Sequence, residues 1–230
     1  MKYNVTALMP MKGNSERVPN KNIRPFSGKP LFHMVLTQLE ACPLIESIII
    51  NTDSEKIMEL ASPFSKVRLL RRPEHICGDH VPMNDIIAHD VSFVETEHIL
   101  QTHSTNPLLT LPTLTEAIQS YFETISQYDS LFSVTVWQSR FYTEDGTPLN
   151  HNPNELLRTQ DLPLLCEENS CMYIFSKKSF LEAGNRRIGL RPRMFLMNKL
   201  ESVDIDNEED FILAETLFRY KMDIKNTVRQ

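Results

Sequence analysis

Short apolar runs alternate with amphipathic stretches along most of this chain of 230 residues. Apolar runs of strand length occupy 5–9, 47–52, 67–70, 98–101, 131–137, 171–175 and 194–197. Helical spacing of apolar residues occurs at 31–39, 57–61, 83–94, 114–125 and 207–220. Alternating strands and helices are typical of βα units, whose crossover helices cover a mostly parallel sheet. The pattern predicts a three-layer α/β fold, with residues 1–230 as one domain.

One segment breaks this alternation. Residues 138–168 are polar, show no helical spacing and contain the hairpin-turn dipeptide Asp145-Gly146. We predict that this segment leaves the main sheet as an excursion, and it is a candidate dimerisation arm.

The composition narrows the range of partners and compartments. Lys and Arg number 24 against 30 Asp and Glu, a net charge of −6. Nucleic acids and anionic membrane surfaces usually require a basic face, so neither is an expected partner. The four cysteines form no C-x-x-C pair, and no apolar run approaches the roughly 18 residues of a membrane span. The N-terminus has no signal-peptide pattern, so we expect a cytoplasmic protein with reduced thiols.

The loop after the first predicted strand is dense in cations. Its charged residues are Lys12, Glu16, Arg17, Lys21 and Arg24. Ligands of open α/β sheets bind outside the carboxyl ends of the strands, where this loop lies. A polyanion such as a triphosphate would use these cations, and Gly13 would let the backbone approach phosphate oxygens. The alternative is a solvated basic loop.

Neither common phosphate-binding fingerprint is present in the chain. The sequence contains no G-x-x-x-x-G-K-[ST] and no G-x-G-x-x-G. P-loop NTPases and dinucleotide-dependent dehydrogenases are therefore not the first choices. Glycine is scarce, with six residues in all, so each is expected to have a positional reason. Gly184 and Gly189 bracket a loop at 185–188 to which the sequence assigns no role.

Two aspartates near the C-terminus form a candidate metal site. In a strand, Asp204 and Asp206 would point to one face while Val203 and Ile205 pack on the other. Mg²⁺ commonly binds one or two carboxylates and takes further oxygens from water and substrate phosphates. Alternatively, Asp206 and Glu209 form a capping box that opens the last helix.

Six blocks of sequence, in order along the chain, match one family pattern. They are Met9 to Arg24 with Gly28 to Leu31, the SIIINTD run at 47–53, Arg72-Pro73-Glu74 leading to Asp79, Leu100-Gln101 with Pro107-Leu108, Asn169 to Phe175, and Val203 to Asp206 with Asp210-Phe211. Together they resemble the acylneuraminate cytidylyltransferases, the CMP-sialic acid synthetase family. The first block is the most specific, and the six span nearly the whole chain.

The resemblance implies a fold and a reaction. The fold is that of the nucleotide-diphospho-sugar transferases, Rossmann-like, with an inserted arm at 138–168 that builds a homodimer. The reaction transfers CMP from CTP to the anomeric hydroxyl of a nine-carbon 2-keto sugar acid, releases pyrophosphate and uses a divalent cation, Mg²⁺.

The resemblance also implies roles for individual residues. Triphosphate binding falls on Lys12, Ser15, Arg17 and Lys21, within a nucleotide-binding loop that includes Gly13 and Asn14. The nucleotide pocket includes Asn22, Arg72 and Asp79, and the sugar side includes Gln101, Asn169 and Tyr173. Asp204 and Asp206 fall on the metal pair, and Arg158 resembles an arginine that reaches the neighbour's site from the arm. Lys21, Arg17 and Asp206 are the predicted catalytic residues, with Asp206 as the acceptor of the hydroxyl proton.

Departures from the family pattern occur in the cationic loop, at the base and on the sugar side. Lys12 stands for the usual arginine, Glu16 for a usual cation, and Pro82 and Met83 lie where smaller residues usually meet the base. The loop at 102–107 is longer than usual, Glu167 stands for a frequent arginine, and Ser170 stands for the usual glycine. The sugar-side changes suggest an altered sugar. Alternatives are a glycosyltransferase, another nucleotidyltransferase such as a 3-deoxy-manno-octulosonate enzyme, or a non-catalytic nucleotide-binding member.

Overall fold

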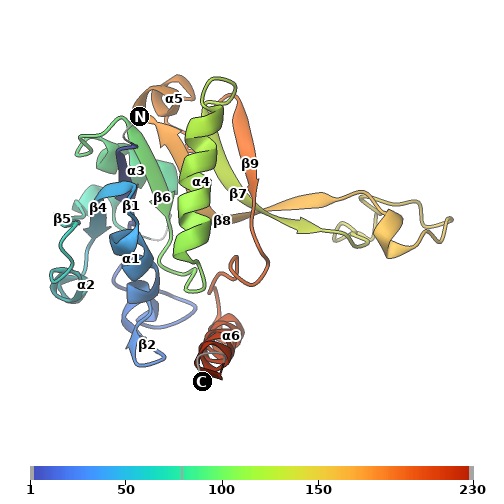
Figure 1. The fold of residues 1–230 in the computed structure, drawn as a ribbon, viewed down its shortest axis with the longest axis horizontal. Coiled ribbons are helices and arrows are strands. Elements are labelled where there is room, and N and C mark those ends of the chain that lie inside the picture. The colour runs from blue at the N-terminus through green and yellow to red at the C-terminus, as the bar shows by residue number, and fades with distance from the viewer. Residues whose placement is uncertain (1–2, 79, 228–230) are drawn as a thin grey trace.

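A seven-stranded sheet forms the centre of the structure, a computed structural model that describes residues 3–78 and 80–227 (Figure 1). In chain order its strands are β1 (Val5–Leu8), β4 (Ile45–Thr52), β5 (Val67–Arg71), β6 (His98–Thr102), β7 (Ser130–Trp137), β8 (Leu165–Ser176) and β9 (Pro192–Leu196). Their order across the sheet is β5-β4-β1-β6-β8-β7-β9. Only β8 runs against its neighbours, β6 and β7. The prediction of a mostly parallel sheet is confirmed.

Helices cover both faces of this sheet, so the predicted three layers are present. One face packs against α1 (Phe32–Ala41), α2 (Glu55–Ala61) and α4 (Leu111–Thr124), and the other against α3 (Met83–Val91) and α5 (Lys177–Glu182). Strand β1 shows why two cores form: Ala7 belongs to the first core and Leu8 to the second, because neighbouring side chains in a strand point to opposite faces. Helix α5 is absent from the sequence prediction because its six residues are too few to show a helical period.

The last helix docks on the loop region near the N-terminus. Helix α6 (Glu208–Thr227) and the two-stranded ribbon of β2 (Pro25–Phe26) and β3 (Lys29–Pro30) share a small core that contains Phe26, Ile205 and Phe211. At its edge, Arg24 donates two hydrogen bonds, of 2.6 and 2.7 Å, to the Glu208 carboxylate. The C-terminal segment is thereby fixed against the cationic loop.

The segment at 138–168 projects from the body as predicted (Figure 1). Its root is a ribbon in which Val134 to Trp137 of β7 pair with Glu168 to Leu165 of β8. Residues 165–168 therefore belong to a strand, and the irregular part of the arm is 138–164. The remaining short elements are 3-10 turns at Lys21–Ile23, Glu74–Ile76 and Thr159–Asp161. No helix within the described ranges has the length and apolar character needed to cross a bilayer.

Candidate active site

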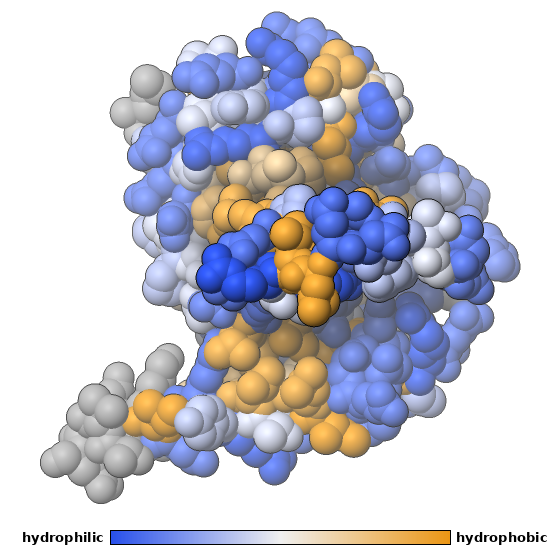
Figure 2. Space-filling view, turned by 90° about the vertical axis from the view of Figure 1, so that its right-hand side faces the viewer, coloured by the Kyte–Doolittle hydropathy of each residue, from blue (hydrophilic) through white to orange (hydrophobic). Residues whose placement is uncertain are grey.

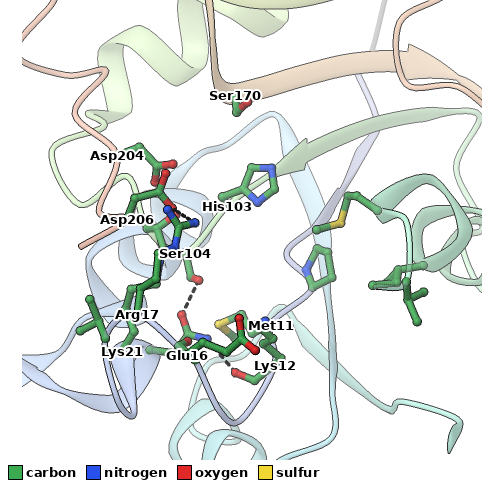
Figure 3. A pocket seen from close by; sticks show the side chains of 18 of the residues that line it. Met11, Lys12, Glu16, Arg17, Lys21, His103, Ser104, Ser170, Asp204 and Asp206 are labelled. Carbon is green, nitrogen blue, oxygen red and sulfur yellow. Dashed lines mark hydrogen bonds and ion pairs between the residues drawn. The ribbon is translucent and has the colours of Figure 1, made fainter. Parts of the chain in front are cut away.

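A cavity of about 540 Å³ opens at the carboxyl ends of β1 and β6, and the irregular segment that leads into α6 closes one side of it. The cationic loop supplies Lys12, Ser15, Arg17, Lys21 and Asn22 to its wall. Figure 3 shows Lys12 and Ser170 well apart in the cavity, with His103 and the two aspartates between them. The predicted loop and the predicted metal pair thus meet in one cavity.

The cationic loop is tied to both sides of the cavity. Arg17 forms an ion pair of 2.8 Å with Asp206, and Lys21 Nζ donates a 2.5 Å hydrogen bond to the carbonyl of Ile205. Asn22 donates to the carbonyl of Lys12 at 2.9 Å and accepts from Ser104 at 2.7 Å. These contacts hold the loop in place around the cavity rather than leaving it in solvent.

Gly13 and Asn14 do not line the cavity. The backbone N–H of Gly13 donates to the Asp53 carboxylate at 2.6 Å, and a Cβ at this position would lie 2.8 Å from the Cβ of Ser54. Close packing against the loop after β4 therefore requires glycine here, which is a different reason from the predicted approach to phosphate. Asn14 is exposed.

Arg72 lies in the cavity wall, almost fully buried. Its Nε donates to Asn51 Oδ1 at 2.8 Å, and its Nη2 donates to the carbonyls of Met11 and Asn51 at 3.2 and 3.1 Å. Asn51 in turn donates to the buried Asp90 at 2.5 Å. Burial lowers the pKa of Arg72 and raises that of Asp90. This network fixes the guanidinium in place. Asp79, the other predicted residue of this region, lies outside the described residues.

The acid pair is not part of a strand, contrary to the prediction. Asp204 and Asp206 lie in irregular chain between β9 and α6, yet both line the cavity. They share it because Ile205 between them is fully buried in the small core, and its N–H donates to the carbonyl of Thr105 at 3.0 Å. Burial of Ile205, rather than a strand, therefore directs both aspartates to the cavity.

The predicted capping box is also wrong. Asn207 Oδ1 accepts from the Asp210 N–H at 3.0 Å, and the Asp210 carboxylate accepts from the N–H groups of Asn207 and Asp206 at 2.9 and 3.0 Å. The reciprocal cap is thus Asn207 with Asp210, one residue later than predicted. The Asp206 carboxylate is not used in capping and faces the cavity.

The electrostatics of the pair suit a cation. Burial raises the pKa of Asp204, the neighbouring Asp206 adds to this shift, and a hydrogen bond from Thr105 opposes it. Asp204 Oδ1 is buried and lacks a hydrogen-bond partner, which is costly for a carboxylate. Burial also lowers the pKa of Lys21, although the two aspartates oppose that shift.

A cation at this pair would need further oxygens from outside the protein. No group of three or more His, Cys, Asp or Glu residues suited to a metal occurs in the part of the chain that the structure describes. Mg²⁺ tolerates such a site because it keeps water and binds substrate phosphate. The orphan oxygen of Asp204 and the adjacent Asp206 fit that ion.

The predicted sugar-side residues lie behind the cavity wall rather than on it. Gln101, Asn169 and Tyr173 are buried and do not line the cavity. His103, Ser170 and Arg187 line it instead, and the arginine comes from the loop between Gly184 and Gly189 that had no assigned role. The sequence does contain a signal for this loop: two adjacent arginines, Arg186 and Arg187, lie between Gly184 and Gly189 in a chain with few glycines.

His103 in this wall has a neutral ring, which accepts hydrogen bonds at Nε2 and carries its proton on Nδ1. Gln101 Nε2 and Arg187 Nη1 approach its Nε2 at 3.3 and 3.4 Å, so Nε2 accepts and the proton is on Nδ1. Burial, together with the charges of Arg187 and Lys21, lowers the pKa of His103 to about 4.

The remaining predicted residue, Arg158, belongs to the arm. It is exposed and forms an ion pair of 2.7 Å with Asp161. Figure 1 shows the arm extending away from the body, so Arg158 does not reach the cavity of its own chain.

One part of the cavity wall is apolar. It consists of Val81, Met83 and Ile86, at the start of α3.

Known proteins resemble this chain along nearly its whole length. The profile of a family described as cytidylyltransferase matches residues 6–227. The chain is 30% identical over 219 residues to the N-acylneuraminate cytidylyltransferase A of Danio rerio, covering 92% of this chain and 50% of that protein. It is 22% identical over 225 residues to a pseudaminic acid cytidylyltransferase of Campylobacter jejuni, covering 92% of this chain and 95% of that one.

The fold is also found among solved structures. That of a CMP:2-keto-3-deoxy-manno-octonic acid synthetase in complex with CTP superposes with a TM-score of 0.71 at 11% identity, covering 95% of this chain and 99% of the other. At this identity the likeness shows the fold alone, and it confirms the α/β architecture predicted from the sequence.

Proposed function

Since the chain belongs to the cytidylyltransferase family of nucleotidyltransferases, we propose that it transfers CMP from CTP to the anomeric hydroxyl of a nine-carbon 2-keto sugar acid. Pyrophosphate leaves in the reaction. The observation that carries the proposal is the meeting of the cationic loop and the acid pair in one cavity. The family match over residues 6–227 supports a single catalytic domain.

The cationic loop is suited to the triphosphate. Attack on the α-phosphate places charge on the leaving pyrophosphate, which fixed cations stabilise. Lys12, Ser15 and Lys21 face the cavity, and Arg17 reaches it through its pairing with Asp206. Arg72 presents a buried guanidinium at the same side, held by Asn51. These side chains would orient the nucleotide without any covalent intermediate.

Asp204 and Asp206 would hold Mg²⁺ when nucleotide binds. When bound, the ion would neutralise phosphate charge and polarise the bond to the leaving group. Asp206 is a candidate acceptor for the proton of the attacking hydroxyl, since its carboxylate lies in the cavity wall beside the proposed metal.

We also propose a homodimer formed through the arm. Exposed apolar side chains on the arm, at Leu149, Leu156 and Leu164, would be buried against a second copy. Figure 2, in which the arm points toward the viewer, shows apolar residues at its tip and on the body around it. The edge strand β9 also exposes Met194 and Leu196. In such a dimer, Arg158 would be free to reach the partner's cavity.

The test is an assay of pyrophosphate release with each of the four nucleoside triphosphates. Acceptors are N-acetylneuraminic, legionaminic, pseudaminic, deaminated neuraminic and 3-deoxy-manno-octulosonic acids, with and without Mg²⁺. We expect release with CTP, Mg²⁺ and at least one nine-carbon acid. No release with any acid would overturn the enzymatic proposal. Release with UTP or ATP alone would overturn the cytidylyl assignment, and release with the eight-carbon acid alone would overturn the acceptor class.

A further inference from the structure

Arg187 places a partly buried cation in the cavity wall. Its guanidinium lines the cavity, and within the described ranges no carboxylate forms an ion pair with it. Burial lowers the pKa of Arg187, although the charges of Tyr173 and Glu168 oppose that shift. A desolvated cation is costly unless an anion accompanies it. The wall is therefore suited to an anionic ligand at this point.

The guanidinium is held by residues that lie behind it. Its Nη1 donates a 2.6 Å hydrogen bond to Gln101 Oε1, and its Cζ lies 3.9 Å above the centroid of the Tyr173 ring. Gln101 cannot turn away, because its Nε2 donates to the carbonyl of Thr102 at 2.9 Å. No described hydrogen bond uses Nε or Nη2 of Arg187. Two nitrogens of the guanidinium, which carry three N–H groups, thus remain for a ligand.

The backbone that carries Arg187 is fixed at both ends. After α5 the chain turns through positive φ at Gly184 (71°) and Asn185 (60°), and the Asn185 N–H donates to the carbonyl of Phe180 at 2.9 Å. Beyond Arg187, a Cβ on Gly189 would lie 2.2 Å from an Asp129 oxygen, so only glycine fits. The Asp129 carboxylate accepts from the N–H groups of the two residues that follow, at 2.9 to 3.1 Å.

The position of the cation distinguishes between the two anions of the reaction. Lys12 and Ser170 are well separated in the cavity (Figure 3). Arg187 contacts His103 and stacks on Tyr173, whose hydroxyl accepts a 3.1 Å hydrogen bond from Ser170 and donates one to Glu168. It therefore belongs to the end of the cavity opposite Lys12, where the triphosphate is proposed to bind. The anion expected at this end is the carboxylate of the acceptor.

We propose that Arg187 binds the carboxylate of the sugar acid through its free donors, and that Gln101 and Tyr173 are positioning residues behind it. His103 completes the subsite with the N–H of Nδ1. This inference rests on the proposed function, because it assigns the acceptor end of the same cavity. It gives the buried residues Gln101 and Tyr173 a role through Arg187 instead of direct contact with the sugar.

The test compares Arg187→Gln with wild type in the pyrophosphate assay, using the acid that the wild type accepts best and its methyl ester. Loss of a charge-assisted contact should raise KM for the acid about 10- to 100-fold and leave KM for CTP unchanged. The preference of the wild type for the acid over its ester should disappear. Arg186→Gln is the matched control, because Arg186 is exposed and bonds only the Ala183 carbonyl in the structure. Calorimetric binding of CTP checks that each variant is folded.

A second variant tests the positioning layer. Gln101→Glu has the same shape, does not touch the cavity, and places a carboxylate against Arg187. It should raise KM for the acid without altering KM for CTP, and Arg187→Lys should recover part of the loss seen in Arg187→Gln.

Three results would overturn the inference, and they differ from one another. Wild type that releases no pyrophosphate with any acid removes the proposed function and this inference together. Active wild type with unchanged acid KM in Arg187→Gln removes the inference alone. A rise in KM for CTP instead of the acid assigns Arg187 to the triphosphate and also removes it.

Discussion

At one end of the cavity Arg17 and Asp206 are exposed and reach inward from loops, whereas at the other end Arg187 is held by buried neighbours. Arg17 and Asp206 are 68% and 51% exposed, and their ion pair is the main contact that either makes. Gln101 and Tyr173, which hold Arg187, are 0% and 1% exposed. An exposed pair of this kind contributes little to stability and exchanges partners readily.

The difference indicates how each end meets its ligand. The phosphate end contains carboxylates and cations that now partly satisfy one another and can change partners when metal and triphosphate arrive. The acceptor end is preformed, which lowers the entropy lost on binding and favours selection of one sugar acid. Substitutions at the first end should therefore affect turnover, and substitutions at the second should affect acceptor choice and stability.

Asp204→Asn tests the phosphate end most severely. We expect kcat to fall about 1000-fold, because the charge that holds the metal is removed from a site of transition-state stabilisation. The raised pKa of Asp204 means that its charged form is disfavoured by burial, so the free energy of unfolding in EDTA should not decrease. Pyrophosphate release and urea unfolding measure the two quantities.

The control for this variant is Glu209→Gln, an exposed carboxyl at the start of α6 that does not line the cavity. It should keep wild-type turnover. If Asp204→Asn kept turnover, or lost stability in EDTA, the phosphate end would not be the ligand-dependent region described above.

Lys21→Met should have the next largest effect. Lys21 lies between the loop and the acid pair, so its loss should lower kcat about 100-fold. Because burial lowers the pKa of Lys21, removing the charge should not destabilise the protein. Steady-state kinetics with CTP as the varied substrate would measure the fall in kcat. Lys29→Met is the control, because Lys29 is exposed and does not line the cavity. An effect confined to KM for the sugar acid would contradict the assignment.

His103→Asn tests the acceptor end through pH. The folded-state pKa of His103, about 4, is below the ordinary value of 6.5, so its stabilising contribution is present above pH 6.5 and is lost as pH falls toward 4. Between pH 7.5 and pH 5 the free energy of unfolding of the wild type should therefore fall by about 1–2 kcal/mol more than that of the variant. The groups that face the ring are Arg187, Lys21 and Gln101.

Urea unfolding at the two pH values gives the comparison. His75→Asn, at an exposed histidine, should retain the wild-type pH dependence. Equal pH dependence in wild type and His103→Asn would show that the ring is not held neutral, and the acceptor end would then be less rigid than described.

Ser170→Gly should have the smallest effect. Ser170 has a positive φ of 58°, which glycine adopts more easily, so stability should rise by up to about 1 kcal/mol. Its hydroxyl lines the cavity, and losing a neutral hydrogen bond to the acceptor should raise KM about 2- to 10-fold. Ser27→Gly, at another positive φ (47°) away from the cavity, should change stability alone. Unchanged KM for the acid in Ser170→Gly would remove the hydroxyl from the subsite.

Prediction from sequence succeeded where the signal was local. The buried strands and the longer helices carry continuous apolar patterns, and the cationic loop is a dense run of chain. It failed where distant parts of the chain decide the structure. Ile205 is held by a core formed with α6 and the β2–β3 ribbon, so no strand is needed for the acid pair.

Arg187 illustrates the same limit. Its loop is fixed by Asp129, which is 61 residues from Leu190, and no periodicity records that contact. Sequence motifs pointed to Gln101 and Tyr173 on the sugar side. In the structure both are buried, and Arg187 lies between them and the cavity. A motif identifies a region, and the packing determines which side chain faces the ligand.

The ion pair between Arg17 and Asp206 has a consequence for how activity develops during synthesis and folding. Its partners are separated by 189 residues, so they meet only after most of the chain has been made. A nascent or prematurely terminated chain can form β1 and the cationic loop early, yet it has no acid pair to complete the site. Contacts of such long range form slowly and late in folding. Catalytic competence should therefore appear with the docking of α6, and a shortened chain should not accumulate partial activity.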